Sequence, residues 1–141
     1  GKGGVFPDKG GYSEVINGSY IWPANGGVTQ GFKKNYHYGI DIANRSRGPI
    51  YATAAGKVVR ASTGWNGGYG NIIVIDHGNG VQSLYAHNQK LYVQVGDHVK
   101  QGENIAYMGN SGNVRGATGI HLHFEIIKNG VKKNPFSYIG K

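Results

Sequence analysis

The sequence has 141 residues, a length that suits one domain with a hydrophobic core of its own. It contains no cysteine, which excludes disulfides and thiolate zinc sites, so any metal ion must be bound by histidine and carboxylate. The formal charge is +8, from 15 Lys and Arg against 7 Asp and Glu. Such a chain is attracted to nucleic acid, to anionic membranes or to the anionic polymers of a bacterial wall.

The basic residues are scattered along the chain rather than gathered on one predicted element. They include Lys33, Lys34, Arg45, Arg47, Lys132 and Lys133. Because the sequence has neither a helix-borne basic stripe nor an aromatic RNA-binding motif, we do not expect nucleic-acid binding. No run of about 18 apolar residues occurs, so no membrane span is predicted. We expect a monomer.

Residues 1–20 are glycine-rich and weakly patterned, and we interpret them as an arm or linker end before a domain that covers residues 21–141. The opening Gly1-Lys2-Gly3-Gly4 lacks the pattern of a signal peptide and is typical of the start of an excised fragment. With 26 Gly and 4 Pro, the chain is predicted to have many turns and no helix.

Short runs of β-branched and aromatic residues, separated by Gly and Asn, predict an all-β domain. The predicted extended segments cover residues 28–32, 36–42, 49–52, 56–61, 71–76, 81–86, 93–99, 104–109 and 119–127, and residues 131–139 close the domain after a turn at 128–130. Asn79-Gly80 is a strong turn signal and predicts a hairpin between residues 71–76 and 81–86. Two glycine-rich loops, at residues 63–70 and 110–118, stand apart from the strands.

A His-x-His pattern lies in the predicted strand 119–127. Side chains two positions apart on a strand share a face, so His121 and His123 point together into one space, while Leu122 and Phe124 point toward a core. Each imidazole nitrogen needs a partner, and a metal ion provides one. The pattern alone is suggestive, and its meaning depends on further ligands.

His37 and Asp41 are the obvious further ligands, because their even spacing places them on one face of an extended segment. Asp41 stands between Ile40 and Ile42, where a bare carboxylate is costly and a neighbouring cation removes the cost. Taken singly, His37 is better explained as a loop histidine and Asp41 as a surface turn residue. Taken with the His-x-His pattern, they indicate a metal site.

Three further histidines lie outside these patterns. His87 ends a predicted strand and faces a loop, where functional groups tend to lie. His77 falls in the predicted hairpin turn and His98 beside Asp97 in a charged turn. We expect His77 and His98 to be solvated and without a direct role.

The segment His37-Tyr38-Gly39-Ile40-Asp41 matches His-x-Gly-x-Asp, and Tyr85-Ala86-His87 and the segment from Gly119 to Glu125 follow in the same order. Over roughly residues 20–139 the chain resembles the lysostaphin-type, or LytM-type, family of zinc metallopeptidases that cut bacterial peptidoglycan. The resemblance implies an antiparallel β-sheet or sandwich core with a loop-walled cleft.

The resemblance also implies the roles of the five site residues. His37, Asp41 and His123 are implied to bind one Zn²⁺ per chain, and His87 and His121 to form the catalytic pair. A catalytic zinc site keeps three protein ligands and one position for water, and two nearby imidazoles can take a proton or stabilise an oxyanion. The division of these two tasks between His87 and His121 stays open.

The implied function is a zinc-dependent endopeptidase that hydrolyses cross-bridge or stem peptides of peptidoglycan. The protein would be secreted or wall-associated, of bacterial or phage origin, with anionic wall polymers as further partners. The loops around Trp65, Tyr69 and residues 110–118 are the expected cleft walls. The charges that flank His37 and Asp41 in sequence are expected to border the cleft: Lys33, Lys34, Arg45 and Arg47. The alternative is a non-catalytic wall-binding or regulatory module of the same fold, although regulators in this family are degenerate in the zinc ligands.

Overall fold

The computed structural model describes residues 20–114 and 119–140. The predicted arm lies outside the described residues except for Tyr20, and so do residues 115–118 of the second predicted loop. Within the described ranges, no helix is long and apolar enough to cross a membrane.

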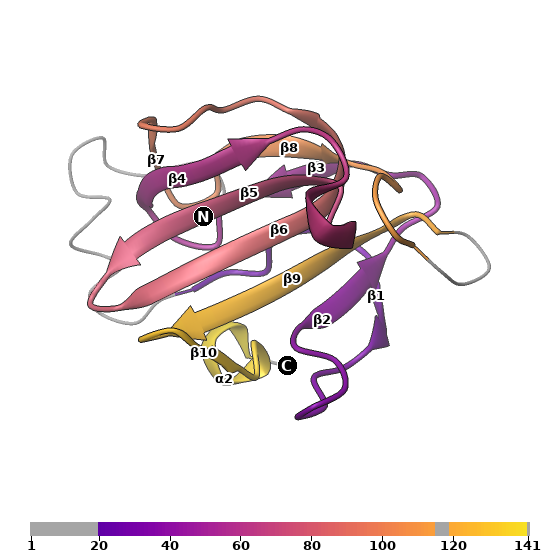
Figure 1. Cartoon of the computed structure of the whole chain (residues 1–141), viewed down its shortest axis with the longest axis horizontal. Coiled ribbons are helices and arrows are strands. Elements are labelled where there is room, and N and C mark those ends of the chain that lie inside the picture. The colour runs from indigo at the N-terminus through magenta and orange to yellow at the C-terminus, as the bar shows by residue number, and fades with distance from the viewer. Residues whose placement is uncertain (1–19, 115–118, 141) are drawn as a thin grey trace.

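The described strands form one ten-stranded antiparallel sheet (Figure 1). The strands are β1 (Gly27–Gln30), β2 (Ile40–Ala43), β3 (Pro49–Tyr51), β4 (Gly56–Ser62), β5 (Asn71–Gly78), β6 (Val81–Leu91), β7 (His98–Val99), β8 (Asn104–Met108), β9 (His121–Lys128) and β10 (Val131–Lys133). The main path runs β1-β2-β9-β6-β5-β4-β7; β10 pairs with β9, and β8 joins β3 to β6. The predicted all-β antiparallel fold is confirmed.

The long strand β6 organises this sheet. It forms the predicted hairpin with β5, and Asn79 and Gly80 in the turn have φ angles of 54° and 80°, which suit a tight hairpin turn. The first part of β6 also pairs with β9, and its last residues pair with β8. Two register shifts interrupt β6 near His87, so the strand carries bulges there.

Two short helices contradict the expectation of none. The 3-10 turn η1 spans Asn66–Gly68, and α2 spans Phe136–Ile139 within the closing segment, where no helix was expected. Pro135 begins α2, because proline has no N–H for a ladder and its fixed φ suits the start of a helix. Of the predicted segment 93–99, only His98–Val99 forms a strand.

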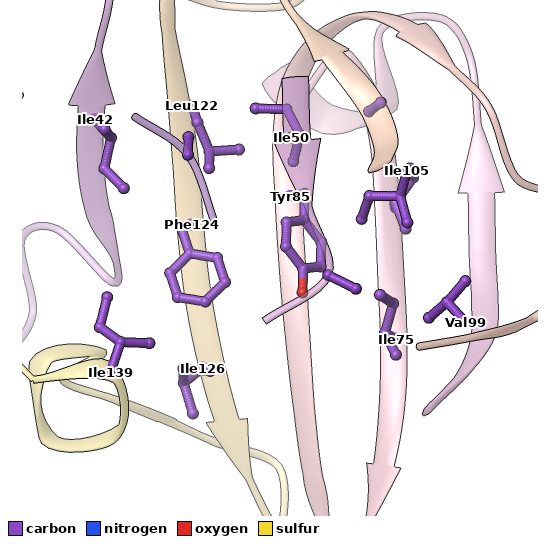
Figure 2. Close-up of a cluster of buried hydrophobic side chains, with 14 of the residues drawn as sticks. Ile42, Ile50, Ile75, Tyr85, Val99, Ile105, Leu122, Phe124, Ile126 and Ile139 are labelled. Atoms are coloured by element: carbon purple, nitrogen blue, oxygen red, sulfur yellow. The ribbon is translucent and has the colours of Figure 1, made fainter. Parts of the chain in front are cut away.

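The main core lies on one face of β9. Leu122, Phe124 and Ile126 are each 0% exposed and pack with side chains from β6, β8 and α2, as Figure 2 shows. The alternate residues of β9, His121, His123 and Glu125, point to the opposite face. The predicted alternation along this strand is therefore confirmed, and it separates a hydrophobic layer from a polar one.

His77 is not solvated, contrary to our expectation. Strand β5 continues through Gly78, which places His77 inside the sheet with 5% of its surface exposed. Its Nδ1 lies 2.7 Å from the Ala55 carbonyl oxygen, and its Nε2 lies 2.7 Å from Ser83 Oγ. Ser83 Oγ in turn contacts the hydroxyl of Tyr85 at 2.7 Å. The histidine therefore belongs to a buried hydrogen-bond chain.

Candidate active site

The ladder register of three neighbouring strands assembles the site. Strands β2, β9 and β6 lie side by side (Figure 1), with Asp41 opposite His123 and His123 opposite Ala86. His37 precedes β2 in a tight turn closed by a bridge to Lys33. All five predicted site residues line one cleft of about 310 Å³, together with Gln30, Gly67, Gly68, Tyr69 and Asn113.

Three candidate metal donors converge in this cleft. His37 Nε2 lies 3.3 Å and His123 Nδ1 2.9 Å from Asp41 Oδ1, and all three donor atoms lie within 4.8 Å of one another. The second ring nitrogen of each histidine is hydrogen-bonded away from the donor group. His37 Nδ1 donates to the Gly31 carbonyl at 2.9 Å, and His123 Nε2 donates to Glu125 Oε2 at 2.8 Å. Two oriented imidazoles and a carboxylate are a donor set that suits Zn²⁺, so the residues fit the implied metal.

The acidic neighbours of His123 control its protonation. Burial by itself lowers the pKa of His123, but hydrogen bonds to Asp41 and Glu125 outweigh burial and raise this pKa to about 9. Burial raises the pKa of Asp41, but the hydrogen bond from His123 and the charges of the surrounding imidazoles bring it below its ordinary value. A proton on His123 therefore occupies the position that a metal cation would take.

His87 and His121 form a second pair, with ring centroids 4.9 Å apart. The φ angle of His87 is 66°, a conformation that is rare outside glycine and lies at the bulge in β6. His87 Nδ1 donates to the Ser111 carbonyl at 2.7 Å, which leaves Nε2 as its basic atom. His121 Nε2 lies 3.8 Å from Asp41 Oδ1, at the edge of the donor group.

Burial keeps this second pair neutral. It lowers the pKa of His87 to about 4, although the hydrogen bond to Ser111 opposes the shift. Burial also lowers the pKa of His121, against the raising effect of Asp41. Near neutral pH both rings are therefore uncharged and can accept or donate a proton.

Two interlocked loops form one wall of the cleft. Ser111 Oγ accepts a hydrogen bond from the Asn71 backbone at 3.0 Å and donates to the Asn88 carbonyl at 2.6 Å. A Cβ atom on Gly70 would lie 2.4 Å from the Ser111 backbone, and one on Gly112 would lie 2.4 Å from the Gly70 nitrogen. Glycine at both positions allows this close contact between the loops.

The structure corrects two expectations about the cleft border. Trp65, which is 62% exposed, is not among the described residues that line the cleft, although Tyr69 of the same loop is. Lys33 and Lys34 are also absent from the described lining, and the Lys33 ammonium lies 5.7 Å from the ring centroid of Tyr36. Proximity in sequence to His37 did not bring the two lysines into the described lining of the cleft, and both are exposed in the turn at residues 33–37.

Sequence reasoning missed the roles of Glu125 and Lys132. Glu125 is 1% exposed and accepts hydrogen bonds from His123, from the Tyr69 hydroxyl at 2.8 Å and from Lys132 Nζ at 2.6 Å. Burial raises the pKa of Glu125, but the bonds from His123 and Lys132 outweigh burial and lower it. The alternation of β9 places Glu125 on the face of His121 and His123, so its position was predictable although its partners were not.

The fold and the site define the class of the protein: an antiparallel β domain with three converging candidate metal donors, two histidines and one aspartate. The chain belongs to peptidase family M23, whose family model matches residues 35–135. That span contains all five predicted site residues.

Two curated relatives show how the chain compares with longer proteins. A lipoprotein NlpD/LppB homolog of Pseudomonas aeruginosa is 39% identical over 124 residues, which are 86% of this chain and 40% of that protein. The murein hydrolase activator NlpD of Escherichia coli is 41% identical over 123 residues, which are 86% of this chain and 31% of that protein. The chain therefore spans less than half the length of these relatives.

Two solved structures share the fold. A zinc containing peptidase from Vibrio cholerae matches with a TM-score of 0.75 and 28% identity, over 82% of this chain and 39% of that chain. The antimicrobial peptidase lysostaphin from Staphylococcus simulans matches with a TM-score of 0.69 and 30% identity, over 84% of this chain and 52% of that chain. These matches confirm the resemblance to lysostaphin-type peptidases and the expected fold class.

Proposed function

We propose that this chain is a zinc-dependent endopeptidase that hydrolyses peptide bonds in bacterial peptidoglycan, in a cross-bridge or a stem peptide. The observation that carries the proposal is the complete constellation in one cleft: three converging donor atoms and two neutral imidazoles beside them. A chain that had lost catalysis would have no physical need to keep both sets together.

The proposed mechanism assigns one task to each group. His37 Nε2, Asp41 Oδ1 and His123 Nδ1 would hold Zn²⁺, which supplies the Lewis acidity that polarises a carbonyl and acidifies water. His87 is the proposed base, because its Nδ1 is committed to the Ser111 carbonyl and its Nε2 can take the proton of water and return it to the leaving amine. His121 stabilises the oxyanion that develops on the scissile carbonyl.

The setting of the protein is part of the proposal. Lipoproteins among the relatives support a secreted or wall-associated location for this chain too. A charge of +8 supports attraction to anionic wall polymers. We propose residues 21–141 as the catalytic domain, residues 1–20 as an arm, and a monomer as the active form.

A second function has one observation in its favour. The relative from Escherichia coli is named a murein hydrolase activator, so this chain could stimulate another hydrolase instead of cutting peptide itself. The complete donor set favours the enzyme over the activator.

The deciding experiment digests purified peptidoglycans of different bridge chemistry with the zinc-loaded protein and identifies the fragments by mass. We expect new amino and carboxyl termini at one type of peptide bond, and none with Asp41→Ala. Intact peptides from every peptidoglycan, combined with faster release by an added murein hydrolase, would establish the activator instead.

A further inference from the structure

The buried carboxylate of Glu125 connects the candidate metal centre to strand β10. Its Oε2 accepts from His123 Nε2 and from the Tyr69 hydroxyl, each at 2.8 Å, and its Oε1 accepts from Lys132 Nζ at 2.6 Å. Three donors therefore meet one carboxylate that is 1% exposed. An ionised carboxylate only accepts hydrogen bonds, so the proton on this side of the imidazole must belong to Nε2.

The position of Lys132 is set by the sheet and by two aromatic rings. Lys132 pairs with Ile127 in the β9–β10 ladder. Its ammonium lies 5.5 Å from the ring centroid of Tyr38 and 5.9 Å from that of Tyr69, within the range of cation–π attraction. The ammonium is therefore held against Oε1 of Glu125, and Oε2 is left to face His123.

We propose that Glu125, oriented by Lys132, is a positioning residue that fixes His123 in the tautomer with its proton on Nε2, so that Nδ1 presents a lone pair to the metal. The inference rests on the proposed metal centre. Partners of this kind on the far nitrogen of a ligand are worth about 10- to 100-fold in metal affinity.

The isosteric change Glu125→Gln separates orientation from packing. A glutamine amide has one accepting oxygen and one donating NH₂ group. The Lys132 ammonium attracts the oxygen, which turns the NH₂ group toward His123 Nε2. A donor at that position favours the tautomer with its proton on Nδ1, the nitrogen that should face the metal. We expect Glu125→Gln to bind Zn²⁺ about 10- to 100-fold more weakly than the wild type.

Removing the ammonium as well should restore affinity. In the double variant Glu125→Gln/Lys132→Met the amide can turn its oxygen to His123 Nε2, so this protein should bind Zn²⁺ more tightly than Glu125→Gln alone. If Glu125 and Lys132 only stabilised the fold, the double variant should bind Zn²⁺ more weakly than Glu125→Gln, because it loses more contacts. Glu103→Gln and Lys128→Met are matched controls, since Glu103 caps the Lys100 backbone and Lys128 binds the Asn79 carbonyl.

The test measures Zn²⁺ affinity by competition with a chromophoric chelator, and the His123 tautomer from the ¹⁵N shifts of its ring. Equal affinity for Glu125→Gln and wild type, or a double variant that binds no better than Glu125→Gln, overturns the inference. If Glu125→Gln does not fold, Lys132→Met decides instead: without the ammonium on Oε1 the Glu125 carboxylate is no longer oriented toward His123 Nε2, so this variant should bind Zn²⁺ more weakly than the wild type, and equal affinity overturns the inference. If the wild type binds no Zn²⁺, the proposed metal centre is overturned together with this inference. If the wild type binds Zn²⁺ and Glu125→Gln binds it equally well, only this inference is overturned.

Discussion

Asp41 on β2 lies directly opposite His123 on β9, and Asp41 Oδ1 is 2.9 Å from His123 Nδ1. The two residues are 82 positions apart in sequence, so the antiparallel register alone brings the two candidate ligands together. A slip of one residue would turn either side chain to the hydrophobic face. The predictions below test the chemistry that this register makes available.

The metal centre should bind one Zn²⁺ per chain. Elemental analysis of protein purified without added metal should find the ion in the wild type and lose it in His37→Ala, Asp41→Ala and His123→Ala, since each change removes one of three donors. Unchanged stoichiometry in any of these variants removes that residue from the ligand set. Zinc at 100 times its dissociation constant should stabilise the wild type by about 2.7 kcal/mol.

The second histidine pair should act in catalysis without holding the metal. His87→Ala and His121→Ala should keep their zinc and lose roughly two to four orders of magnitude in turnover, because acid–base or oxyanion support is removed. Turnover on a bridge peptide and zinc content are measured on the same preparations. His98→Ala, on β7, is the control and should stay active. A fast His87→Ala enzyme would show that another group is the base.

Zinc affinity should increase as the pH rises toward 9. The pKa of His123 is about 9, so a proton must leave this imidazole before the metal can bind Nδ1. Affinity should change about tenfold per pH unit for each proton released, when measured by chelator competition between pH 6 and 9. An affinity that is constant over this range contradicts the raised pKa.

Acid should destabilise the zinc-free protein through His77. Burial lowers the pKa of His77 from its ordinary 6.5, and the opposing effects of Ala55 and Asp76 are smaller. The unfolded chain therefore takes up a proton below about pH 6.5, while the folded chain does so only at lower pH. The stability contributed by His77 is complete above pH 6.5 and decreases as the pH falls toward the folded pKa.

Urea unfolding at pH 7.5 and pH 5 measures this effect, with His77→Gln as the comparison. The lowered pKa values of His87 and His121 also reduce stability as the pH falls, but they do so in the wild type and in His77→Gln alike. His77→Gln should be less stable at pH 7.5, since two buried partners lose their bonds, and should lose less stability on acidification. Equal losses in the two proteins exclude His77 as the source.

Salt should weaken the attack on intact cells more than the cleavage of a small substrate. The attraction of a +8 chain to an anionic wall acts over about a Debye length, some 8 Å at physiological ionic strength. Lysis should therefore fall steeply as salt rises, while cleavage of a short neutral bridge peptide changes little. Charge reversal at Lys33 and Lys34, which lie outside the cleft lining, should mimic high salt on cells only. A parallel decrease of both activities would place the salt effect in the cleft itself.

Much of the site was predictable because alternation along a strand is a local property. The spacing of His121 and His123 and of His37 and Asp41 indicated which side chains share a face, and the structure gathers them in one cleft. The ordered motifs added His87, although its left-handed backbone could not be read from the residues around it.

The errors concern contacts between distant residues. Tyr69 and Glu125 are 56 positions apart, and no local pattern indicates that their side chains meet. His77 was placed in a turn because Asn79-Gly80 follows closely, yet β5 continues to Gly78 and buries the ring. Lys33 and Lys34 showed the reverse error, since closeness along the chain was taken for closeness in space.

The close contact between the two loops at Gly70 and Gly112 also limits which substitutions the cleft tolerates. A side chain at either glycine would separate the two loops and withdraw the Ser111 carbonyl from His87, so single substitutions there cost the proposed base along with the wall. Substitutions that change substrate preference are therefore expected at lining positions outside this contact, such as Gln30 and Asn113. The wall of this cleft therefore tolerates substitution only where the two loops do not touch, and changes in substrate preference are expected at its rim.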